Sequence, residues 1–263
     1  MMFLIDDDTS VHQITPSGYS TGLLPAIMSS EEDSEAITEA DFPLIPMEEW
    51  PDRISDLESN HATLKHIWAD SVIGVLDQGN LPYCHAFSPV VAMMILREAQ
   101  GLPYVELSAG SVGGPVTNYR RRGAWIVDDL DRITQHGAAT TEFVPMSQVS
   151  RSGWEPGADE NCNLHRVLEW NKLKRRNFEQ HASSLLTCQP TCVGLNYWGH
   201  AVTDLVLRDI YPSKAAADHG RYGVEFLNSW STSWGDGGFG VRVGGKKFAD
   251  EAYVPRRITS SVA

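Results

Sequence analysis

The sequence lacks the features of an exported or membrane-anchored protein. Only four of its 263 residues are cysteine, too few for the disulfide framework of a typical secreted domain. No apolar run approaches the roughly 20 residues that cross a bilayer. Residues 1–8 include no basic residue, and their apolar stretch is too short for a secretory signal. We therefore expect no membrane association, and a location inside a cell or within a particle such as a virion.

Basic residues are almost missing from the N-terminal end. Residues 1–60 contain 14 Asp and Glu against the single Arg53, whereas residues 61–263 contain 20 acidic and 20 basic residues. The formal net charge of −13 therefore comes from the N-terminal part alone. A neutral body with an acidic extension does not provide the basic surface that nucleic-acid binding requires, so we expect no nucleic-acid partner.

Residues 1–41 are predicted to be an acidic extension. They are rich in Ser, Thr, Asp, Glu, Pro and Gly, show no sustained periodicity, and contain too few apolar residues to fold alone. Three interpretations remain open: a flexible arm, an inhibitory pro-segment, or an arm that docks on a protein partner or a larger assembly. Residues 42–263 begin with a proline-punctuated entry and are predicted to form the folded domain.

The most informative stretch is residues 77–88, Asp-Gln-Gly-Asn-Leu-Pro-Tyr-Cys-His-Ala-Phe-Ser. It reads as a loop that ends at Cys84, followed by apolar residues at helical spacing. A cysteine at a helix start lies near unsatisfied amides, whose partial positive charge favours the reactive thiolate. Gln78, six positions before Cys84, could offer its side-chain amide to the oxyanion formed when a thiolate attacks a carbonyl.

Periodicity predicts the remaining elements. The predicted helices cover residues 84–101, 119–135 and 163–186, the last being one long charged helix. The predicted strands cover residues 71–76, 191–197 and 223–230, and a glycine-rich turn and a returning strand occupy residues 231–243.

Residues 77–88 resemble the papain-like cysteine peptidases, which have a Gln-Gly segment, a cysteine at a helix start and a following Ala-Phe-Ser. The resemblance extends over about residues 70–245. It includes His200 in a His-Ala-Val context and Asn228 in Asn-Ser-Trp before a Trp-Gly pair and a glycine-rich hairpin. His200 and Asn228 lie 116 and 144 residues after Cys84, close to the roughly 130–150 residues typical of the family.

The resemblance implies an α+β fold of two lobes, with an active-site cleft between a helical lobe, which carries the central Cys84 helix, and an antiparallel sheet or barrel lobe. It also implies a peptide-hydrolysing Cys84–His200 pair, with Asn228 orienting the imidazole and Gln78 in the oxyanion hole. No cofactor is expected. Trp230 would shield the His200–Asn228 bond from water.

The resemblance further implies a substrate-binding surface. Gly113 and Gly114 would let a substrate backbone lie against the enzyme as an added strand. Trp198, two positions before His200, would narrow the pocket for the residue two positions before the cut. The chain departs from the family at Leu81, where a disulfide-forming cysteine is usual, and at His85, which places a second imidazole next to Cys84 in sequence.

Two further hypotheses concern other chemistry. Cys162, His165, Cys188 and Cys192 have spacings that could form a zinc site, although ordinary unligated side chains are the simpler interpretation. The alternative to a peptidase is a papain-fold binding or structural module in a larger assembly such as a virus particle. The altered residues around Cys84 and the acidic extension motivate that alternative.

Overall fold

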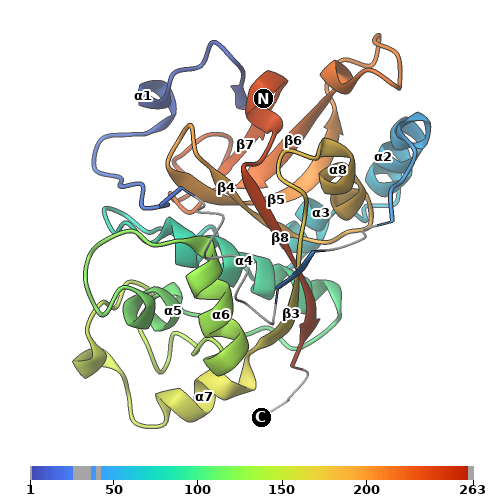
Figure 1. Cartoon of the computed structure of the whole chain (residues 1–263). Helices are drawn as coiled ribbons and strands as arrows, with labels where there is room; N and C mark the ends of the chain where they lie inside the picture. Colours follow the sequence, from blue (N-terminus) through green and yellow to red (C-terminus); the bar gives the residue numbers. More distant parts are fainter. Residues whose placement is uncertain (1, 26–36, 40–42, 260–263) are drawn as a thin grey trace.

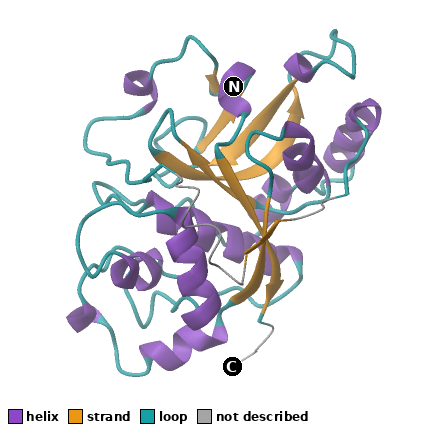
Figure 2. Ribbon diagram, in the orientation of Figure 1, coloured by secondary structure: helices purple, strands orange, loops and turns teal. Residues whose placement is uncertain are grey.

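The computed structural model describes residues 2–25, 37–39 and 43–259. It contains helices and one large mixed sheet, which confirms the α+β class (Figures 1 and 2). Helices α4 (Cys84–Ala99), α5 (Ala109–Val116), α6 (Ile126–His136) and α7 (Ala158–Leu164) gather on one side. Helices α1 (Val11–Ile14), α2 (Trp50–Ser59), α3 (Leu64–Asp70) and α8 (Phe178–Leu186) accompany the sheet. In the described part of the chain, no helix is long and apolar enough to cross a membrane.

The sheet has eight strands in the order β1-β7-β6-β5-β4-β8-β3-β2. Their bounds are β1 Leu4–Ile5, β2 Ile37–Glu39, β3 Val167–Lys172, β4 Thr191–Leu195, β5 His200–Asp209, β6 Tyr222–Leu227, β7 Phe239–Arg242 and β8 Glu251–Ile258. The pairs from β7 to β3 are antiparallel, whereas the two edge strands β1 and β2 pair in parallel with their neighbours. The fold is the expected two-lobed one, with α4 against β5 where the lobes meet.

The predicted helix over residues 163–186 is wrong. The chain forms the end of α7, then β3, and only then α8. Trp170 is fully buried in the core and lies opposite Pro255 of β8. Arg176 has a positive φ of 56°, and the Asn177 side chain accepts a hydrogen bond from Gln180 N, which starts a new helix. Pairing with β8 outweighed the local helical preference because it buries Trp170.

The predicted strand over residues 71–76 is also wrong, because this segment is irregular. Its remaining sheet-like contacts are an isolated bridge between Asp77 and Trp230 and a bond from Ser231 N to Leu76 O of 3.1 Å. These contacts still deliver the loop that carries Gln78. The predicted helix over residues 119–135 begins later than expected, at Ile126, and ends at His136 before Gly137, which has a φ of 79°.

The first part of the acidic extension is built into the sheet lobe. Strand β1 pairs with β7, and Ile5 and Ile14 are buried in an apolar cluster with Trp198, Trp230 and Trp234. The flexible-arm interpretation therefore does not describe residues 2–25. The most acidic part of the extension falls mainly in residues 26–36 and 40–42, which lie outside the described residues, so its proposed docking on a partner stays a prediction.

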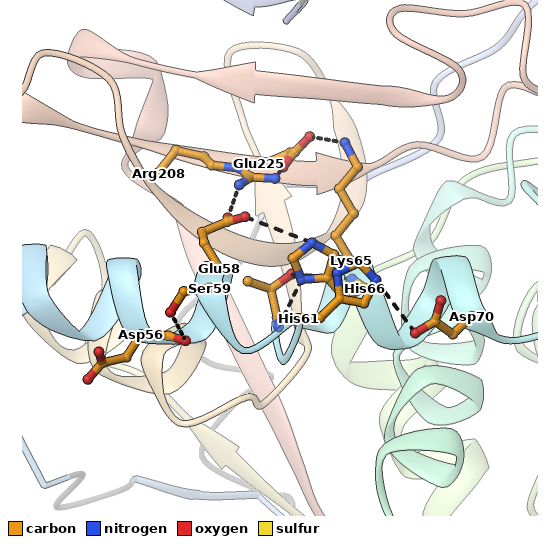
Figure 3. Close-up of polar contacts among 10 residues, drawn as sticks. Asp56, Glu58, Ser59, His61, Lys65, His66, Asp70, Arg208 and Glu225 are labelled. Carbon is orange, nitrogen blue, oxygen red and sulfur yellow. Dashed lines mark hydrogen bonds and ion pairs between the residues drawn. The ribbon is translucent and has the colours of Figure 1, made fainter.

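A network of ion pairs fastens α2 and α3 to the sheet (Figure 3). Glu225 of β6, which is buried, accepts bonds from Lys65 Nζ at 2.5 Å and from Arg208 Nε at 2.6 Å. Arg208 of β5 also pairs with Glu58 of α2. Because each charge has an opposite partner, the cost of burying Glu225 is offset. The network fixes the helices that precede the Gln78 loop.

Candidate active site

Cys84 is the first residue of α4, as the sequence predicted. Helix α4 continues without a break over Pro89, and nearly all its residues are buried. The sulfur is 0 % exposed. Burial raises the pKa of the Cys84 thiol to about 11, although nearby amides, first that of Ala201, oppose the shift. In this conformation Cys84 is therefore a thiol. Ala201 is adjacent to His200 in β5, so α4 and β5 bring the two predicted catalytic segments together.

His200 and Asn228 form the predicted pair. His200 Nε2 lies 2.8 Å from Asn228 Oδ1, and Trp230 covers the imidazole with a centroid distance of 4.4 Å. Burial lowers the pKa of His200 to about 4, although the Asn228 bond favours the charged ring. A neutral ring carries one proton, and an amide oxygen can only accept, so that proton is on Nε2. Nδ1 is left as a base, with no hydrogen-bond partner among the described residues.

Both the backbone and the side chain of Gln78 bond to Ser229, the residue after Asn228. Its backbone N–H donates to Ser229 O at 2.9 Å, and its Oε1 accepts from Ser229 Oγ at 2.7 Å. This second bond orients the amide so that Nε2 points the other way, where it donates to Leu81 O at 2.8 Å and Ser20 O at 2.9 Å. The predicted oxyanion donor thus already holds two carbonyl oxygens, that of Leu81 in its own loop and that of Ser20.

Ser20 belongs to residues 19–24, which we call the strap. Gly22 N donates to Cys84 Sγ at 3.3 Å. Leu23 N donates to Gly199 O at 3.1 Å, next to His200. On the helical lobe, Ala124 N donates to Gly22 O and Leu24 N donates to Ala124 O, both at 3.0 Å. The strap therefore crosses the cleft as an extended chain that bonds to both lobes, which accounts for the burial of Cys84.

The crossing requires glycine at two positions. A Cβ on Gly22 would lie 1.9 Å from Pro82 O, and a Cβ on Gly123 would lie 2.1 Å from Gly22 O. Both distances are far below contact, so neither position accepts a side chain without backbone movement. The sequence left a pro-segment open as one interpretation of residues 1–41 but did not locate the strap, because neither glycine stands in a recognisable motif and the contacts are made by backbone atoms.

The N-terminal segment before the strap is anchored on the sheet lobe. Trp234 Nε1 donates to Ile14 O at 2.8 Å, and Trp198 Nε1 donates to Thr15 Oγ1 at 2.9 Å. Trp198 is only 3 % exposed and packs among the other tryptophans of this cluster. The structure thus places Trp198 under the N-terminal segment, and its expected role in the substrate pocket stays a prediction.

Gly113 and Gly114 also lie elsewhere than expected. Both are buried inside α5, so their backbone groups are helical and do not form an open edge for a substrate strand. A Cβ on Gly113 would lie 2.7 Å from the Tyr83 ring. Tyr83 is itself buried, and its hydroxyl donates to Arg120 O at 2.9 Å. Gly113 therefore makes room for the tyrosine before Cys84, and Ala124 provides the strand-like contact instead.

His85 pairs with a buried carboxylate of the helical lobe. Its Nδ1 lies 2.6 Å from Asp129 Oδ2 of α6, and both side chains are fully buried. Burial raises the pKa of the Asp129 carboxyl, while His85 opposes that shift. The second imidazole next to Cys84 in sequence therefore ties α4 to α6.

The zinc hypothesis is wrong. Cys188 Sγ donates to Ala62 O at 3.3 Å and Cys192 Sγ donates to Tyr253 O at 3.4 Å, whereas Cys162 belongs to a separate apolar cluster. Among the described residues, which include all four candidates, no group of three or more His, Cys, Asp or Glu side chains could hold a metal ion. All four cysteines are free thiols.

Comparison with known proteins supports this fold. The sequence matches no protein-family model and no curated protein. Among solved structures, it is similar to xylellain, a cysteine protease from Xylella fastidiosa, with a TM-score of 0.61 and 16 % identity, covering 94 % of this chain and 97 % of that one. It is also similar to digestive procathepsin L2 proteinase of Tenebrio molitor, with a TM-score of 0.63 and 17 % identity, over 93 % and 81 % of the two chains.

A third similar structure is the bromelain protease of Ananas comosus in complex with the E64 inhibitor. Its TM-score is 0.58 at 16 % identity, covering 73 % of this chain and 96 % of that one. At such identities the likeness concerns the fold. Together with the lobes, the Cys84 helix and the Asn228 segment, it shows that this chain has the papain-like cysteine protease fold.

Proposed function

We propose that the protein is a cysteine peptidase whose nucleophile is Cys84, with His200 as base, Asn228 as orienting residue and Gln78 as oxyanion donor. The observation that carries the proposal is the imidazole. Its Nε2 is taken by Asn228, and its Nδ1 has no hydrogen-bond partner in the described part of the chain. An unprotonated ring nitrogen next to the segment that carries Cys84 is the atom that a general base needs to take the thiol proton.

The reaction would proceed by acyl transfer to sulfur. His200 Nδ1 takes the Cys84 proton, and the thiolate attacks the carbonyl carbon of the scissile bond. The oxyanion accepts hydrogen bonds from Gln78 Nε2 and the Cys84 backbone N–H, and one such donor is typically worth about 3–4 kcal/mol of barrier. The imidazolium gives its proton to the leaving amine. Water then hydrolyses the thioester and releases the acid.

We also propose that the strap inhibits this site in the manner of a pro-segment. The strap presents the Gly22 amide nitrogen to the sulfur, while the carbonyl bound by Gln78 belongs to Ser20, two residues away. The strap thus occupies both the sulfur and the oxyanion donor, so it blocks the site. Its release would let water reach the site, which would lower the pKa of Cys84 and raise that of His200.

A thiol-reactive epoxide tests the catalytic assignment. We expect it to label Cys84 in the folded protein once the strap is displaced, and labelling at pH 7 to fall at least tenfold in His200→Ala, which removes the base. Cys84→Ala is the control for the site of labelling. Mass spectrometry locates the adduct, and hydrolysis of short peptide libraries by the same protein then reports on peptidase activity. Equal labelling rates with and without His200 would contradict the proposal.

The burial of the pair favours a second candidate, a papain-fold binding module. Cys84 and His200 are both inaccessible, and their pKa values are shifted in the directions that keep both neutral. A module predicts that Cys84 stays unlabelled and peptides stay intact even when the strap is released. The peptidase predicts that release produces both activities.

A further inference from the structure

A second hollow lies in the helical lobe, far from the strap. It is a cavity of about 640 Å³ between the end of α4, the loop at residues 102–106, residues 140–143 and α7. Arg97 and His165 line it together with apolar side chains that include Val105 and Phe143. Arg97 is 13 residues after Cys84 on α4, which corresponds to about 20 Å along the helix. The cavity is within the size range of sites that bury a small organic molecule.

Arg97 is a buried cation. The residue is only 4 % exposed, and no carboxylate pairs with it in the described part of the chain. It donates to Pro103 O at 3.2 Å and to Thr259 O at 3.4 Å, and its Nε has no hydrogen-bond partner among the described residues. The two carbonyls and the negative end of α4 offset part of the burial cost, but neither supplies a full negative charge.

The surroundings of Arg97 separate a polar end from apolar walls. His165 is 6 % exposed, and its Nδ1 has no hydrogen-bond partner among the described residues. Burial, and secondly the charge of Arg97, lowers the pKa of His165 to about 4. The negative charge of a bound anion would oppose this effect of Arg97 and raise the pKa of His165. The acidic lining residues Glu142 and Glu160 are exposed, whereas Arg97 and His165 are buried. The inner part of the cavity is therefore suited to negative charge, and its exposed rim is not.

We propose that this cavity binds a small organic carboxylate, with the carboxylate group on Arg97 and an apolar body against Val105 and Phe143. A guanidinium offers a planar fork of donors that matches a carboxylate. A charge-assisted pair with the ligand would give Arg97 the negative partner that the described residues do not supply. The site is separate from the peptidase proposal and does not depend on it.

Benzoate and its neutral analogue benzamide test this site on the full chain by titration calorimetry. We expect benzoate to bind at least tenfold more tightly than benzamide, because only benzoate supplies the missing charge. Arg97→Met should weaken benzoate binding at least tenfold, which corresponds to about 1.4 kcal/mol. Arg53→Met is the matched control, since Arg53 is exposed on α2, and it should bind benzoate as the unaltered protein does.

Val105→Trp provides a test that leaves the charge in place, in case Arg97→Met does not fold. The larger side chain should occupy the cavity and abolish benzoate binding. The proposal is overturned if benzoate binds no better than benzamide, or if both Val105→Trp and a folded Arg97→Met bind benzoate as the unaltered protein does.

Discussion

At the scale of single residues, Gly22 decides whether the cleft is closed. Gly22→Ala adds a Cβ that would collide with Pro82 O, and overpacking of this kind typically costs about 1–3 kcal/mol. Since 1.4 kcal/mol is a factor of ten, we expect roughly 5- to 150-fold faster epoxide labelling of Cys84. Thr21→Ala, in the same segment, should change the rate little. An unchanged labelling rate in Gly22→Ala would show that the strap does not inhibit this site.

The pH dependence of labelling should distinguish the closed and open forms. In the unaltered protein the thiolate population of Cys84 rises only as the pH approaches its pKa of about 11. In Gly22→Ala the burial that raises this pKa is relieved, so the rise should occur at lower pH. Rates measured between pH 5 and 11 give both profiles. Superimposable profiles would mean that strap release does not change the environment of the sulfur.

At the scale of secondary-structure elements, Glu225 joins α3 and β5 to β6. Glu225→Gln removes the charge that both Lys65 and Arg208 use. Breaking such a buried pair typically costs about 3–5 kcal/mol, and because Lys65 and Arg208 are partly exposed we expect about 2–3 kcal/mol in urea unfolding. Asp70→Asn is the control, because Asp70 is 69 % exposed, and it should cost under about 0.5 kcal/mol. Equal losses in the two variants would show that the network adds no stability.

At the scale of the whole molecule, stability should depend on keeping His200 neutral. Its pKa is 6.5 in an unfolded chain and about 4 in the folded one. Between these values the unfolded chain takes up a proton that the native protein does not, so the free energy of unfolding falls as the pH falls. For His200 alone the loss is about 2 kcal/mol at pH 5. Denaturant unfolding at pH 7 and pH 5 measures it, and a folded His200→Gln variant should show a loss smaller by that amount.

The parts of the site that sequence predicted are those set by local motifs. Cys84 at a helix start, and Asn228 next to a tryptophan in a glycine-rich hairpin, each follow from a few adjacent residues, and His200 follows from its context. The strap did not follow, because it depends on backbone bonds between Gly22 and Ala124, which no side-chain pattern encodes. The helix predicted over residues 163–186 was wrong for a related reason. Residues 167–172 form β3 because they pair with β8, more than 80 residues later in the sequence.

The position of β1 also constrains the order in which the molecule can be assembled. Residues 4–5 pair with residues 241–242, so strand β1 leaves the ribosome long before the strand with which it pairs. Strand β8 emerges later still and enters between β4 and β3. Pairings this distant in sequence form slowly. During synthesis the Cys84 helix is therefore complete long before β7 can hold β1, the strand that precedes the strap.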